Sequence, residues 1–137
     1  NGCLETYVSV DSALRHLAAR GIDVESMAAF EERFDARHPD VAPWIQAGIE
    51  PLRIGLNTIE NLFDPETIML GGNAPGWLID ALVEGVQPLY PSVGRHNREI
   101  PRLIKAALGR DAVSRGAAVL PLLSQLNPQY QQLNPFA

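Results

Sequence analysis

The chain has 137 residues, of which 46% are hydrophobic, and its formal net charge is −5 at pH 7. These values are typical of a folded domain, or of part of a larger one, and not of a disordered segment. The basic residues are scattered without a Lys/Arg-rich block, so we expect no direct binding to nucleic acid. The apolar runs fall well short of the roughly 20 residues that cross a bilayer, which favours a cytoplasmic location without a membrane partner.

Apolar residues recur at helical spacing in two segments of the first third of the chain. They predict one helix from about 9 to 20 and a second from about 24 to 37. His38-Pro39 ends the second helix because a residue that precedes proline avoids the helical region.

The strongest apolar stripe runs from Val41 to Leu62 and predicts a long third helix, with Asp40 as its N-cap. Pro51 lies inside the stripe and predicts a kink, because proline removes one backbone donor. The stripe resumes at once, which favours one bent helix over two. An apolar stripe of this length is expected to face another lobe or subunit, so we predict a homo-oligomer.

The next segments predict a strand, a helix and a second strand. The short apolar run 67–70 stops at Gly71-Gly72, a helix is predicted over 78–86, and 102–108 is the second strand candidate. This order is consistent with one right-handed parallel crossover. Two strands are too few for an independent sheet, so we expect further strands upstream.

The C-terminal part of the chain predicts a last helix, which Asp111 can cap and in which small residues suit close packing. Residues 127–137 carry Asn and Pro breaks without periodicity and predict an extended tail. The fold class is therefore α/β, helix-rich, with a short parallel strand pair.

Three stretches of the chain resemble motifs of one known protein family. Gly2-Cys3-Leu4-Glu5 resembles the close of the family's zinc-binding signature. The stretch 62–72, Leu-Phe-Asp-Pro-Glu-Thr-Ile-Met-Leu-Gly-Gly, and the stretch 107–118, Ala-Leu-Gly-Arg-Asp-Ala-Val-Ser-Arg-Gly-Ala-Ala, are similar to two further family motifs. Each motif alone is weak, but the three keep the order and spacing of the ROK family (repressor, open reading frame, kinase), which this chain resembles.

The resemblance implies an actin-like fold (sugar kinase/Hsp70, or ribonuclease H-like) with two lobes and a sugar bound between them. Residues 1–126 would be a partial C-terminal sugar-binding lobe, and 127–137 its tail. We then expect the chain to begin within the zinc signature. The aspartate base that family kinases carry in the first lobe would have no counterpart in it.

Cys3 is the only cysteine, so the chain cannot form an internal disulfide. By the resemblance Cys3 is the last cysteine ligand of a zinc ion in the parent protein. One thiolate is too few for a site that needs about four ligands, so three partners would have to come from elsewhere. The alternative is a lone cysteine that packs as a small hydrophobe.

By the same resemblance Glu5 contacts the sugar, and a carboxylate can accept hydrogen bonds from two adjacent hydroxyls. The alternative is a solvated glutamate that the helix dipole favours near a helix start. The three histidines receive no catalytic role. The acidic pair Glu60 and Asp64 is expected on a solvated helix face.

Gly71 and Gly72 lie between a strand and a helix, where backbone amides and the positive helix end can approach a ligand. In family kinases this loop lies beside ATP, so Gly71, Gly72 and Asn73 are the candidate nucleotide-binding residues. The alternative is a tight turn without a ligand. Many family kinases carry a third glycine after this pair, where this chain has Asn73-Ala74-Pro75. Asn73 and Pro75 restrict the backbone conformations of the loop more than glycine would.

Two functions remain open. The favoured one is the sugar-sensing and oligomerisation portion of a transcriptional regulator, whose DNA-binding helix-turn-helix is not in this chain. The alternative is the C-terminal lobe of a sugar kinase that uses ATP and Mg²⁺ to phosphorylate a hexose or an N-acetylhexosamine. The departure at Asn73-Ala74-Pro75 and the long ending after Leu120 favour the regulator.

Overall fold

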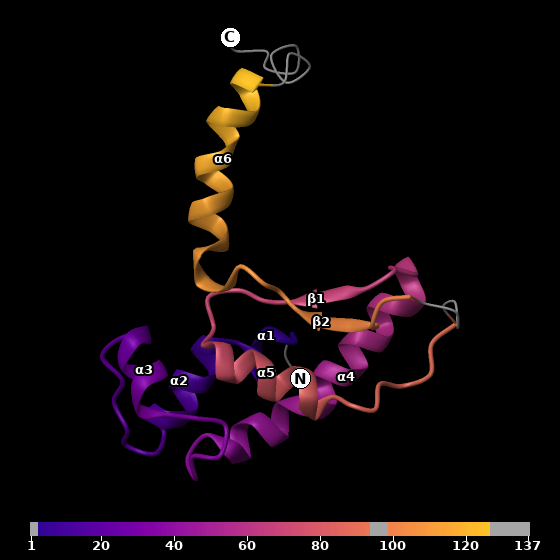
Figure 1. Cartoon of the computed structure of the whole chain (residues 1–137). Helices are drawn as coiled ribbons and strands as arrows, with labels where there is room; N and C mark the ends of the chain where they lie inside the picture. Colours follow the sequence, from indigo (N-terminus) through magenta and orange to yellow (C-terminus); the bar gives the residue numbers. More distant parts are fainter. Residues whose placement is uncertain (1–2, 94–98, 127–137) are drawn as a thin grey trace.

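The computed structural model describes residues 3–93 and 99–126 of the chain. Helices α1 to α5 form a body beneath two short strands, and α6 extends away from that body (Figure 1). The predicted tail at 127–137 lies outside the described residues. In chain order the elements are α1 (Glu5–Val8), α2 (Val10–Ala18), α3 (Met27–Arg33), α4 (Ala42–Phe63), β1 (Ile68–Leu70), α5 (Gly76–Gly85), β2 (Leu103–Lys105), the 3-10 turn η1 (Gly109–Asp111) and α6 (Ala112–Leu126).

Serine residues set the starts of α2 and α3. Ser9 is extended, and its Oγ accepts a hydrogen bond of 3.0 Å from the Ser12 backbone N–H, which separates α1 from α2. Ser26 caps α3 in the same way through Ala29. Helix α3 ends before Phe34, which has an extended backbone, so this helix is shorter than the predicted range 24–37.

Helix α4 runs for 22 residues and continues through Pro51, as the resumed stripe predicted. Its N-cap is Val41, which makes no side-chain cap bond, so the prediction of Asp40 as N-cap was wrong. Asp40 instead binds the segment that follows α2, because its carboxylate accepts a bond of 3.2 Å from Arg20. Its carbonyl oxygen also lies 3.0 Å from His16 Nε2.

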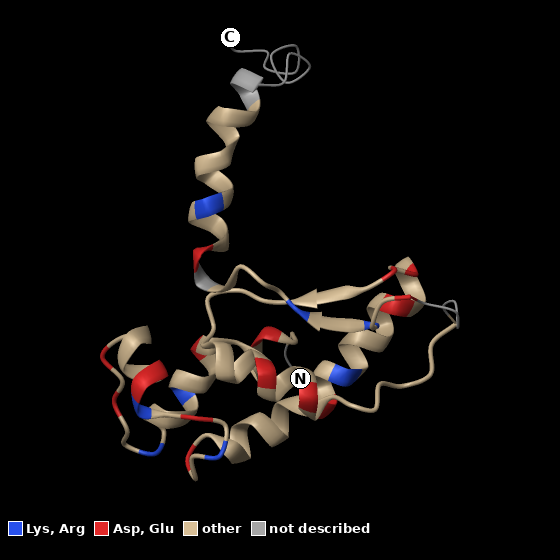
Figure 2. Cartoon of the chain, viewed as in Figure 1, with Lys and Arg blue, Asp and Glu red and all other residues tan. Residues whose placement is uncertain are grey.

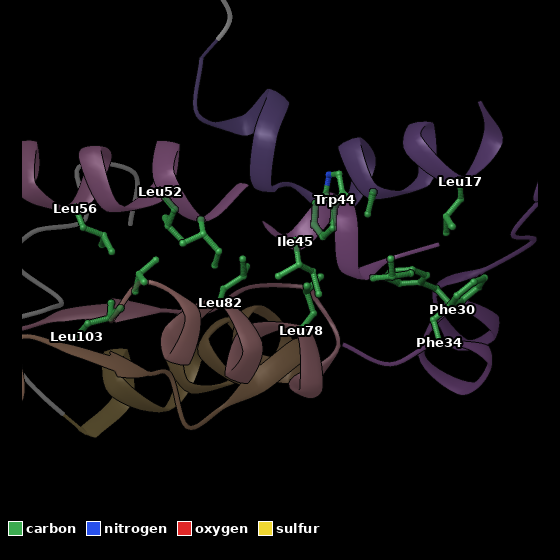
Figure 3. Packing of buried hydrophobic residues seen from close by; sticks show 14 residues of the cluster. Leu17, Phe30, Phe34, Trp44, Ile45, Leu52, Leu56, Leu78, Leu82 and Leu103 are labelled. Carbon is green, nitrogen blue, oxygen red and sulfur yellow. The ribbon is translucent and has the colours of Figure 1, made fainter. Parts of the chain in front are cut away.

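The apolar stripe of α4 is buried inside the chain's own core. Leu52 and Leu56 face Leu82 of α5 and Leu103 of β2 (Figure 3), and all four are at most 5% exposed. The expectation that this stripe faces another lobe or subunit was therefore wrong for most of its length, because α1, α2, α5 and β2 of the same chain cover it. Only its end stays open, where Leu62 is 71% exposed. The homo-oligomer remains a prediction.

The strand pair is parallel, as predicted, with Ile68 opposite Leu103 and Leu70 opposite Lys105. Backbone bonds extend it at both ends, from the Ile68 N–H to the Arg102 carbonyl at 2.9 Å and from the Ala106 N–H to the Leu70 carbonyl at 2.8 Å. Since side chains alternate along a strand, the core-facing side carries Leu103. Met69, in the middle of β1, is 65% exposed.

Helix α6 presents apolar side chains to solvent. It carries almost no charge (Figure 2), and Val113, Leu120 and Leu122 are 82%, 62% and 57% exposed. Within the described ranges, no helix combines the length and the apolarity needed to cross a membrane.

Candidate functional site

Helix α1, which carries the first candidate residues, rests on the middle of α4. Two glycines of α4 face it: Gly48 lies against Val8 and Tyr7, and Gly55 lies against Leu4. Because glycine has no side chain, the two helices approach closely at these points. The segment that carries Cys3 and Glu5 is thereby fixed relative to α4.

Cys3 is exposed and lies two residues before the start of α1. Its carbonyl oxygen accepts two hydrogen bonds from Thr6, of 3.0 Å from the backbone N–H and 2.8 Å from the hydroxyl, which hold the first turn of the helix. In the part of the chain that the structure describes, no three His, Cys, Asp or Glu side chains gather so as to hold a metal ion. One thiol does not fit a zinc ion, so the ligand role of Cys3 remains a prediction for the parent protein.

Glu5 is the first residue of α1 and is exposed. Its carboxylate is therefore accessible to a ligand from solvent. Its position in the first turn also agrees with the alternative of a dipole-stabilised surface glutamate. The sugar contact of Glu5 remains a prediction.

The loop from Gly71 to Pro75 connects the carboxyl end of β1 to α5. A side chain at Gly71 would not fit, because its Cβ would lie 2.5 Å from the Ala106 Cβ. Gly72 has a φ of +136°, a conformation that favours glycine, and no atom lies within 4 Å of its Cβ position. The space beside Gly72 is therefore open to a ligand, whereas the space beside Gly71 is filled by Ala106. Asn73, the third candidate residue, is exposed.

The start of α5 places positive charge beside this loop. Pro75 occupies the N-cap and makes no side-chain cap bond, so no cap side chain occupies the positive helix end. Lys105, at the end of β2, donates from Nζ to the Gly76 carbonyl at 3.1 Å and to Asp80 Oδ2 at 2.7 Å. Sequence reasoning did not single out Lys105. The parallel register is what places it beside the first turn of α5.

Glu60 was expected on a solvated face, and this was wrong because its side chain is only 1% exposed. Both its carboxylate oxygens accept hydrogen bonds from Arg102, one of them from Nε at 2.7 Å. Arg102 Nη2 also donates to the Tyr90 carbonyl at 2.7 Å. The hydrogen bonds to Glu60 raise the pKa of Arg102. The pair joins α4 to the start of β2 and to the connection between α5 and β2.

Further polar residues of α4 hold the same connection. Asn57 Nδ2 donates to the Pro91 carbonyl at 2.8 Å, and Arg53 Nε donates to the Val86 carbonyl at 3.0 Å. Tyr90 donates its hydroxyl hydrogen to Glu50. That bond lowers the pKa of the Glu50 carboxyl and raises the pKa of the Tyr90 hydroxyl. These contacts hold residues 86–91, the first part of the connection between α5 and β2, against α4.

The structure therefore places the candidate residues on two separate elements. Cys3 and Glu5 belong to the α1 segment on α4, whereas Gly71, Gly72 and Asn73 form the turn after β1. The first group offers a thiol and a carboxylate. The second offers backbone amides, a helix N-terminus and a nearby ammonium group, which together suit an anionic ligand.

Comparisons with known proteins identify a matching family and two similar proteins. A family model described as the ROK family matches residues 1–123. The N-acetyl-D-glucosamine kinase of Mannheimia succiniciproducens is 31% identical over 120 residues, and the protein of the same name in Pasteurella multocida is 26% identical over 121 residues. Each alignment covers 86% of this chain and 38% of the relative. The chain thus spans well under half the length of these relatives.

Proposed function

The chain belongs to the ROK family, and from this premise we propose that it is the C-terminal lobe of a sugar kinase that phosphorylates an N-acetylhexosamine with ATP. The observation that carries the proposal is that both relatives named above are N-acetyl-D-glucosamine kinases that align along 86% of the chain. This reverses the preference for a regulator that the sequence alone favoured.

The turn at Gly71–Asn73 would meet the phosphates of ATP. Its backbone is open at Gly72, and the uncapped start of α5 attracts negative charge. Lys105 adds a positive charge beside Gly76, although Asp80 offsets part of it. Phosphoryl transfer relies mainly on positioning and on charge stabilisation, with Mg²⁺ on the phosphates. The aspartate base would come from the first lobe, outside this chain.

The exposed carboxylate of Glu5 would bind the sugar. A carboxylate accepts hydrogen bonds from two neighbouring hydroxyls of a pyranose, and such charge-assisted bonds are stronger than neutral ones. Zinc would be held in the parent protein by Cys3 with ligands from outside this chain. Its part there would be to fix the fold around the sugar-binding segment.

The second candidate is a sugar-responsive transcriptional regulator of the same family. The observation that favours it is Pro75 at the N-cap of α5, directly after Asn73-Ala74. Proline fixes the backbone there and contributes no N–H donor to the turn. In a regulator the bound sugar would tune a DNA-binding segment that lies outside this chain.

Turnover by the intact parent protein separates the two candidates. Purified protein with N-acetyl-D-glucosamine, ATP and Mg²⁺ should release ADP in a coupled assay. Sugar binding by calorimetry without ADP release would overturn the kinase and support the regulator. In either case Glu5→Gln should weaken sugar binding by more than about tenfold, because it removes the charge from the hydrogen bonds.

The nucleotide role of the turn has its own test. Gly72→Ala places a side chain at a φ of +136° and should raise the KM for ATP by about tenfold while the KM for the sugar stays the same. Gly21→Ala is the matched control, because Gly21 also has a positive φ, of +76°, and open space around its Cβ position. Equal effects of the two variants on the KM for ATP would remove the turn from the nucleotide site.

A further inference from the structure

Helix α1 rests on α4 at a point where an added methyl group has no space. A Cβ at Gly48 would lie 2.7 Å from Val8 Cγ1 and 3.1 Å from the Tyr7 carbonyl oxygen. Val8 is β-branched and stiff about χ1, and the second neighbour is backbone. Neither can move aside as the end of a flexible chain can, so α1 itself would have to shift away from α4.

Gly55 lies one heptad further along α4 and makes a different contact. A Cβ there would meet only the side chain of Leu4, at 3.0 Å from Cδ2. This methyl group ends a flexible side chain and can rotate away. Glycine-to-alanine substitutions at these two positions of α4 can therefore be compared. At Gly48 the added methyl group meets a rigid neighbour, whereas at Gly55 it meets a flexible side chain.

A shift at Val8 is carried to Glu5 through the backbone of α1. The Val8 N–H bonds to the Leu4 carbonyl at 3.2 Å, and the Ser9 N–H bonds to the Glu5 carbonyl at 3.3 Å. These bonds close one helical turn, so the segment 4–9 moves as one piece. A displacement of Val8 therefore displaces the Glu5 carboxylate.

We propose that Gly48 is a positioning residue for Glu5. Because Gly48 has no side chain, α1 lies close against α4, and this close contact determines where the Glu5 carboxylate meets the sugar. This rests on the proposed sugar-binding role of Glu5. Placement of a binding group within a fraction of an ångström governs its hydrogen bonds, so a displaced α1 weakens sugar binding while the turn at Gly71–Asn73 keeps its geometry.

The experiment compares Gly48→Ala, Gly55→Ala, Val8→Ala and the double variant Gly48→Ala/Val8→Ala in the intact parent protein. Affinity for N-acetyl-D-glucosamine is measured by calorimetry, and circular dichroism checks that each variant folds. Gly48→Ala should weaken sugar binding by about tenfold, and Gly55→Ala by less than twofold. Val8→Ala removes the carbon that clashes, so the double variant should recover at least half of the loss on a logarithmic scale.

Amide NMR of each variant gives a second reading, which holds even where the sugar affinity is too low to measure. Gly48→Ala should shift the amide signals of residues 4–8 more than Gly55→Ala does. The inference is overturned if the wild type binds sugar and the affinity of Gly48→Ala is within twofold of the wild-type value. It is also overturned if the double variant Gly48→Ala/Val8→Ala binds sugar no more tightly than Gly48→Ala. A wild type that binds no sugar would instead refute the proposed function itself. Unshifted amide signals in Gly48→Ala would contradict the claim that Gly48 sets the position of α1 on α4.

Discussion

Arg102→Leu should destabilise the protein strongly, because it removes both hydrogen bonds that Arg102 donates to the buried Glu60 carboxylate. Glu60 is 1% exposed and accepts hydrogen bonds from Arg102 on both oxygens. The substitution also removes the donor that Arg102 Nη2 supplies to the Tyr90 carbonyl at 2.7 Å. The junction of α4, β2 and the connection before β2 would therefore lose its central contact.

The size of the effect follows from burial. Breaking a buried ion pair by removal of one partner costs about 3–5 kcal/mol. The Arg102 side chain is 30% exposed, so water reaches its side of the pair and reduces the loss. We expect about 2–3 kcal/mol for Arg102→Leu, which is just below the range for a fully buried pair. Glu60→Leu should cost less, since the arginine left behind is partly solvated.

Replacement of both residues by leucine should recover most of this loss, because a buried pair can often be exchanged for apolar side chains at little cost. Urea unfolding followed by circular dichroism gives the free energies, with equal m-values as the check on two-state behaviour. Arg115→Leu is the control, since its pair with Asp111 is exposed and spans 3.9 Å, and it should cost less than about 1 kcal/mol. A loss below about 1 kcal/mol for Arg102→Leu would refute the reasoning, since this is the size of an exposed pair.

Two further changes test other contacts. Gly85→Ala places a Cβ at 2.4 Å from Ile49 Cδ1, so urea unfolding should show a loss of about 1–3 kcal/mol of stability from overpacking. Ile49→Val removes the Cδ1 atom, so adding it to Gly85→Ala should relieve this loss. If the effects of the two substitutions on stability simply add, the contact is not the cause. Tyr90→Phe removes the bond that lowers the pKa of Glu50, so an NMR titration should show this pKa rise. Because the pKa of Glu50 is lowered in the folded protein, ionised Glu50 stabilises the fold at pH values above its ordinary pKa. This stabilisation is lost as the pH falls through the pKa of the folded state. Tyr90→Phe should therefore flatten the acid side of the stability profile, and an unchanged profile would oppose this assignment.

Glu60 illustrates what sequence reasoning missed and why. It lies four and eight residues after Leu56 and Leu52, so helical spacing alone puts it on the buried stripe of α4. Its acidic character led to the expectation of a solvated face. The partner that makes burial favourable, Arg102, is 42 residues away in sequence. No local pattern contains that information.

The strand pair and the order of the helices could be predicted, because they depend on spacing and turn residues within short segments. Apolar runs that stop at Gly71-Gly72 mark a strand end, and the resumed stripe after Pro51 marks a continuous helix. The ends of α3 and α4 could not be placed as well. Phe34 leaves the helix to pack in the core, and Val41 rather than Asp40 starts α4, since Asp40 binds Arg20 instead.

By itself, the sequence determined the family, the element types and the candidate residues Cys3, Glu5 and Gly71–Asn73, since short motifs and periodicity carry these. Only the tertiary structure decided which faces meet. It showed that α4 buries its stripe against α5 and β2, that α1 lies close against Gly48 of α4, and that Lys105 lies beside the start of α5. The physical reason is that these contacts join residues far apart in the chain. Packing selects them, and no single segment specifies its partner.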